Sequence, residues 1–98
     1  METNLTTNDI STLVIMARTS SFMTDDENIK YISTLFHTEY SQLIAWLVLL
    51  KVTGKTAETS VDIIGKLKEK GLLKSPSEYG AYVLSKAQEA AKTIIKMA

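Results

Sequence analysis

The chain has 98 residues, of which 45% are hydrophobic and 22% charged, and its formal net charge is zero. This length suffices for one small domain, and we expect residues 1–98 to form a single one. The hydrophobic content is that of a globular protein and excludes a disordered chain. No cysteine is present, which excludes disulfides and thiolate metal sites and favours a cytoplasmic, intracellular location.

Neither a secretory leader nor a membrane partner is expected. The sequence begins Met-Glu-Thr-Asn and has no basic segment ahead of an apolar one, so it does not resemble a signal peptide. The longest apolar run is residues 43–50. As a helix it would extend only about 12 Å, which is much less than a bilayer core. We therefore expect this run to lie in the protein core.

The zero net charge conceals two halves of opposite sign. Residues 1–50 carry two basic and six acidic side chains, for a net charge of −4. Residues 51–98 carry nine lysines and five acidic side chains, for a net charge of +4. Such an asymmetry can orient a protein on a phosphate backbone, on a protein partner or on a second copy of itself.

A first helix is predicted to run from a threonine cap to about Ser20. Thr6 or Thr7 is suited to the cap, and we expect residues 1–6 to be frayed. The helical spacing of the apolar side chains gives this segment one broad apolar face. Its members are Ile10, Leu13, Val14, Met16 and Ala17.

A second helix is predicted to begin at Thr24. Glu27 stands three residues after this threonine and completes a capping box. Asp25 and Asp26 then lie in the first turn, where the helix dipole favours negative charge. This role accounts for the acidic cluster without a metal ion.

From Ile29 the apolar side chains keep a helical spacing up to Leu50. The pattern predicts one long helix over residues 25–53, with a break near Thr38 or Ser41 as the alternative. After Tyr40 the segment is apolar on nearly all sides, which predicts a helix in the middle of the domain. Gly54 is expected to end it.

Two further helices are predicted in the basic half. Residues 56–70 carry apolar side chains at helical spacing, and Gly71 follows where a left-handed cap is expected. Residues 75–78 read Ser-Pro-Ser-Glu, which is typical of a helix start. Read as one helix, the last segment spans residues 76–97. The whole pattern predicts an all-α, compact four- or five-helix bundle with an apolar central helix.

The motifs that would indicate catalysis or a cofactor do not hold. Residues 54–56, Gly-Lys-Thr, match the end of a phosphate-binding loop, but Leu49 stands where that loop needs glycine. His37 is the only histidine, and neither a second metal ligand nor a nucleophile is placed beside it. We therefore expect no enzyme activity, no cofactor and no metal site.

The lysines of the basic half are the strongest candidate for a functional site. Phosphate contacts require positive side chains in a row or patch, and this half has lysines but no arginine. The residues predicted to contact nucleic acid are Lys66, Lys68, Lys70, Lys74 and Lys86.

Residues 59–95 carry a pattern of a threonine-led helix followed by Gly-Leu. The helix segment reads Thr-Ser-Val-Asp-Ile-Ile-Gly-Lys-Leu-Lys-Glu-Lys-Gly-Leu-Leu over residues 59–73. This pattern resembles the C-terminal part of winged-helix DNA-binding domains. The resemblance implies a small β-wing at residues 72–84, with strands at 72–75 and 81–84, in place of one long last helix.

The same resemblance implies a recognition helix that enters the major groove. Its exposed positions would be Ser60, Lys66 and Lys70, with Lys74 at the wing.

Three functions are compatible with this sequence. The first is a small helical accessory or assembly subunit, of the general character shared by many viral proteins. Its acidic half would face a protein partner or another copy, and its basic half would face nucleic acid. The second is a winged-helix transcriptional regulator. The third is a protein-only inhibitor or immunity-type module, for which both charged halves would serve protein contacts.

Overall fold

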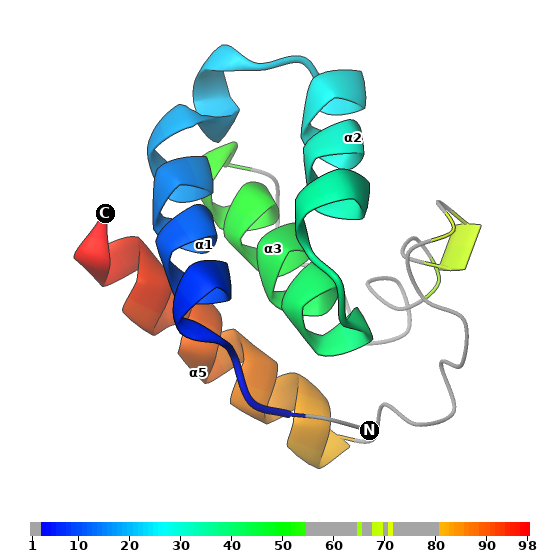
Figure 1. Cartoon of the computed structure of the whole chain (residues 1–98), viewed down its shortest axis with the longest axis vertical. Coiled ribbons are helices and arrows are strands. Elements are labelled where there is room, and N and C mark those ends of the chain that lie inside the picture. Colours follow the sequence, from blue (N-terminus) through cyan, green and yellow to red (C-terminus); the bar gives the residue numbers. More distant parts are fainter. Residues whose placement is uncertain (1–2, 55–64, 66–67, 70, 72–80) are drawn as a thin grey trace.

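The computed structural model describes residues 3–54, 65, 68–69, 71 and 81–98, and these residues form an all-α bundle. Its elements are α1 (Thr7–Thr19), the short 3₁₀-helix η1 (Ser20–Phe22), α2 (Asp25–Leu35), α3 (Glu39–Val52) and α5 (Ala81–Met97). Figure 1 shows α1, α2 and α5 arranged around α3. The prediction of an all-α bundle is confirmed.

Threonine side chains cap the starts of α1, α2 and α3. The Thr6 hydroxyl accepts from the Asp9 amide at 3.0 Å, and the Thr24 hydroxyl accepts from the Glu27 amide at 3.2 Å. In both turns the carboxylate accepts in return from the threonine amide, which completes a capping box. The helix start predicted at Thr24 is confirmed, and of the two caps predicted for the first helix, Thr6 or Thr7, the structure has Thr6.

The chain leaves the helical path between α2 and α3, so the prediction of one long helix over residues 25–53 is wrong. Phe36 is extended, with φ −108° and ψ 123°. The Thr38 hydroxyl accepts from the Ser41 amide at 3.1 Å and starts α3. The Gln42 side-chain amide donates to the Phe36 carbonyl at 3.0 Å. These side-chain bonds serve backbone groups that a continuous helix would pair, and they favour the alternative break near Thr38.

α3 is the central helix of the bundle. Every residue over 43–50 is buried, and α1, α2 and α5 all pack against it. A helix that is apolar on all sides is stable only when it is enclosed. The predicted apolar helix after Tyr40 is therefore confirmed. Trp46, the only tryptophan of the chain, is 3% exposed in this core.

α5 covers α3 with a single apolar stripe. The buried members of this stripe are Leu84, Ala87, Ala91 and Ile94, which recur every three or four residues. Two of the four are alanines, whose small side chains allow the backbones of two helices to approach closely. The stripe fixes the rotation of α5 and so determines which of its side chains face outward.

The alternative fold with a β-wing is not supported at its returning strand. Residues 81–84 form the first turn of α5, where the wing required an extended strand. Leu84 is buried against the core by this helical turn, which an extended segment would not do in the same phase. The other expected parts of the wing, residues 72–80, lie outside the described residues.

Two glycines adopt the left-handed conformation that their positions require. Gly54 has a φ of 72° directly after α3, and Gly71 has a φ of 75°. The Gly71 amide donates to the Lys68 carbonyl at 3.0 Å. Both glycines therefore lie where helix ends were predicted. Most of the helix predicted over 56–70 lies outside the described residues.

A buried hydrogen bond stabilises the corner between α1 and α2. The Asn28 side-chain amide donates to the Ser20 carbonyl at 3.0 Å. Both residues are fully buried, so breaking the bond would leave polar atoms without compensation from water. The Met23 amide also donates to this carbonyl, at 3.3 Å. The corner is thus held from two sides.

Replacing Thr24 with alanine should lower the free energy of unfolding by about 1 kcal/mol, because the α2 cap is lost. Urea unfolding followed by Trp46 fluorescence measures the change. Thr34→Ala is the matched control, since Thr34 is exposed within α2. It should leave stability unchanged or raise it slightly, because alanine favours helix. Equal losses in both variants would contradict the capping role.

The capping box also predicts a pH dependence. Hydrogen bonds with Thr24 lower the pKa of the Glu27 carboxyl below its usual value of 4.5. The bond from the Thr24 backbone amide has the larger effect, and the bond with the Thr24 side chain has the smaller one. A lowered folded-state pKa contributes stability above the unfolded-state value, and this contribution is lost as the pH falls through the folded-state pKa. Glu27→Gln should therefore destabilise the protein at pH 7 and cost progressively less below about pH 4. Urea midpoints across this range test it, and a pH-independent difference would contradict it.

Candidate functional site

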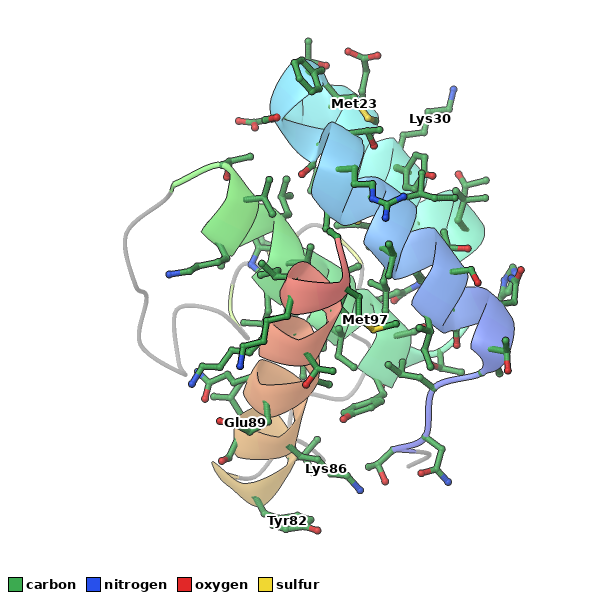
Figure 2. The ribbon with its side chains drawn as sticks, turned by 90° about the vertical axis from the view of Figure 1, so that its left-hand side faces the viewer. Met23, Lys30, Tyr82, Lys86, Glu89 and Met97 are labelled. Atoms are coloured by element: carbon green, nitrogen blue, oxygen red, sulfur yellow. The ribbon has the colours of Figure 1, made fainter. Side chains whose placement is uncertain are left out.

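The outer face of α5 is the most basic surface of the described helices. Because the apolar stripe points inward, the intervening positions of α5 face solvent. The exposed side chains of this face are Tyr82, Ser85, Lys86, Glu89, Lys92, Thr93 and Lys96. Figure 2 shows Lys86 and Tyr82 projecting outward from the start of the helix. We call this surface the α5 face.

The α5 face carries three lysines and one glutamate, so its net charge is positive. The Lys92 Nζ lies 3.4 Å from the Glu89 Oε1, and the two side chains are 70% and 73% exposed. A pair so open to water contributes little, and Lys92 is therefore free to exchange Glu89 for another anion. Lys96 lies in the last turn, where the helix dipole also favours a cation.

A hollow of about 360 Å³ lies between α3 and α5, beside the α5 face. Its apolar side chains are Leu47, Ala91 and Ile95, and its polar side chains are Lys51, Gln88, Glu89 and Lys92. Lys51 is contributed by the last turn of α3. Two ammonium groups thus border an apolar surface. We call this hollow the basic groove.

The structure places only part of the predicted lysine site. Lys68 and Lys86 are described, and both are exposed helical residues. Lys66, Lys70 and Lys74 lie outside the described residues. Within α5, Lys86 is exposed together with Lys92 and Lys96, neither of which was among the predicted contact residues. The contribution of Lys51 was missed, because only the packing of α3 on α5 brings it to this surface.

The acidic residues of α2 lie away from the start of α5. Asp25, Asp26 and Glu27 are exposed in the first turn of α2. Figures 1 and 2 place the start of α2 and the start of α5 at opposite ends of the bundle, marked by Met23 and Tyr82 in Figure 2. Among the described residues, the acidic cluster of α2 is therefore separated in space from Lys86 at the start of α5.

A second hollow, of about 400 Å³, lies along α2. It is lined by Met23, Glu27, Lys30, Tyr31, Thr34 and Leu35. Its polar lining combines one carboxylate with one ammonium, so it has no strong preference for the charge of a ligand.

Tyr40 and His37 differ in their environment. Burial raises the pKa of the Tyr40 phenol, and the nearby Tyr82 adds to the effect, so Tyr40 remains protonated at neutral pH. His37 is exposed. Over the same residues no three histidine, cysteine or acidic side chains are grouped to hold a metal ion. None of the described helices has the length and apolar character needed to cross a membrane.

Comparison of the chain with protein-family models, with curated proteins and with solved structures finds no match. Function must therefore be inferred from the surfaces themselves. The two features that stand out are the positive charge of the α5 face and the apolar basic groove next to it.

Glu89→Gln should change the free energy of unfolding by less than about 0.5 kcal/mol, because the pair with Lys92 is exposed. Urea unfolding followed by Trp46 fluorescence tests this. Leu84→Ala on the same helix is the positive control, because truncating this buried side chain should cost about 2–5 kcal/mol. A loss of more than about 1 kcal/mol for Glu89→Gln would show that the ion pair has a structural role.

Proposed function

We propose that the chain is a small, non-catalytic helical accessory or assembly subunit. Its basic C-terminal half contacts nucleic-acid backbone, and its acidic N-terminal half contacts a protein partner. The observation that carries the proposal is the α5 face, where Lys86, Lys92 and Lys96 are all exposed on one helix. The core already holds α5 in place through the opposite side of the helix, so these lysines are not needed to cover apolar surface.

The type of side chain favours contact with phosphates over reading of bases. The basic half has nine lysines and no arginine. Lysine acts as a point charge towards phosphate, whereas arginine is the commoner reader of guanine in the major groove. Binding is therefore expected to be indifferent to sequence and strongly dependent on salt.

The helical first turn of α5 argues against binding of DNA through a β-wing. A winged-helix regulator would place a strand at residues 81–84, and these residues are helical. The proposed contact therefore uses the side of a helix along the phosphate backbone, and it does not require a β-wing.

Fluorescence anisotropy with labelled single-stranded and double-stranded DNA and RNA should show binding at about 50 mM salt that weakens by at least tenfold at about 200 mM. Lys86→Glu should weaken binding by about tenfold at the lower salt, because a phosphate contact becomes a repulsion. Lys30→Glu is the matched control, since it makes the same charge change on an exposed lysine of α2. It should have a much smaller effect.

Two further variants define which lysines take part. The double variant Lys86→Glu, Lys96→Glu should reduce the slope of log affinity against log salt by about 2, at about 0.9 per lost duplex contact. Charge reversal of Lys66, Lys68 and Lys70 tests the lysines predicted from the sequence in the same way. Absence of any binding at low salt would overturn the nucleic-acid contact and leave a protein-only interaction module.

A further inference from the structure

Phe22 is the most exposed large apolar side chain of the described residues. It is 88% exposed at the end of η1, although the corner around it is held by the buried contact between Asn28 and Ser20. A phenyl ring held in water by a fixed corner contributes nothing to the core. Such a ring is therefore a candidate contact for another molecule.

Three carboxylates follow this ring closely in the chain. Asp25, Asp26 and Glu27 follow within five residues of Phe22, and all three are exposed. We call Phe22 with these three residues the acidic knob. A partner surface that fits it has to offer an apolar recess with positive charge at its border.

The basic groove of the same chain has this chemistry. Leu47, Ala91 and Ile95 provide apolar surface. Lys51 and Lys92 outnumber the one carboxylate of the lining, Glu89, so the groove keeps a net positive charge. Its volume of about 360 Å³ leaves room for one aromatic ring. By contrast, the hollow along α2 is bordered by Glu27 and Lys30 together, so it offers no net attraction to an acidic knob.

We infer that the acidic knob of one copy docks in the basic groove of a second copy. The high exposure of Phe22 shows that it does not occupy the groove of its own chain. The knob and the groove share no residue, so the contact is heterologous and each copy keeps one free knob and one free groove. Copies would therefore join head to tail into a ring or an open filament.

This inference deepens the proposed assembly role by identifying the protein partner as another copy, but it does not depend on the nucleic-acid contact. One aromatic side chain buries about 150–250 Å², far below the roughly 800 Å² per partner of a stable interface. Each contact is therefore weak alone. Binding of neighbouring copies to one nucleic acid would strengthen it through effective concentration.

Sedimentation velocity without nucleic acid, from about 10 µM to about 1 mM protein, tests the association directly. The weight-average sedimentation coefficient should rise with concentration for the wild type and stay at the monomer value for Phe22→Ala. Circular dichroism checks that this variant keeps its helices. A wild type that remains monomeric at about 1 mM, or a Phe22→Ala variant that associates like the wild type, would overturn the inference.

Lys92 belongs to both the basic groove and the α5 face, whereas Lys86 belongs to the α5 face alone, so matched charge changes at these two residues test the groove. Lys92→Glu lies at the groove and should abolish association, whereas Lys86→Glu lies outside it and should leave association unchanged. Asp26→Lys should also weaken association, and its combination with Lys92→Glu should restore it in part because the two charges are exchanged. Equal effects of Lys92→Glu and Lys86→Glu would show a general charge effect and overturn docking in the groove.

Mixing two defective variants tests the head-to-tail arrangement. Phe22→Ala has a groove without a knob, and the double variant Lys51→Glu, Lys92→Glu has a knob without a groove. Each alone should be monomeric, and their mixture should form a one-to-one dimer that grows no further. A mixture that stays monomeric would overturn the inference.

The two proposals fail separately. If Lys86→Glu loses nucleic-acid binding but associates normally, the nucleic-acid contact uses the α5 face and the contact between copies does not depend on it. A wild type that binds nucleic acid but never self-associates leaves the proposed function intact and removes only the knob-and-groove contact.

Discussion

The enclosure of α3 is the constraint on which the rest of the structure depends. Eight consecutive apolar residues, 43–50, are all buried, so no side of this helix can face water without loss of hydrophobic free energy. α1, α2 and α5 each supply an apolar side to it. Their outer sides are then left to carry whatever contacts the protein makes. The acidic start of α2 and the basic side of α5 are consequences of this division.

Local signals account for the parts of the fold that could be predicted. A capping box needs only residues within one turn, so Thr24 could be identified as a helix start without knowledge of the packing, and the first helix start could be narrowed to Thr6 or Thr7. The apolar character of α3 likewise required only its own sequence. The break before α3 could not be decided, because Phe36 and Tyr40 are buried on both sides of it and their spacing also fits a continuous helix.

The candidate site was predictable to the extent that it lies on one helix. Lys92 and Lys96 are four residues apart and share one side of α5, whereas Lys86, six residues before Lys92, projects about 120° away from it on the same solvent-facing half of the helix. Lys51 is 35 residues earlier than Lys86, and only tertiary packing carries it to the groove. The exposure of Phe22 was equally hidden, since an aromatic residue between two helices is more often buried than not.

The hydrogen bond from Asn28 to the Ser20 carbonyl has a consequence for recognition as well as for folding. Because both residues are fully buried, the corner that carries Phe22 is anchored to the core before any partner arrives. Ordering a loop on binding lowers affinity, and a corner that is already ordered avoids this loss. A small contact surface can then be selective despite its size, because the interior of the protein sets the backbone position from which the ring projects.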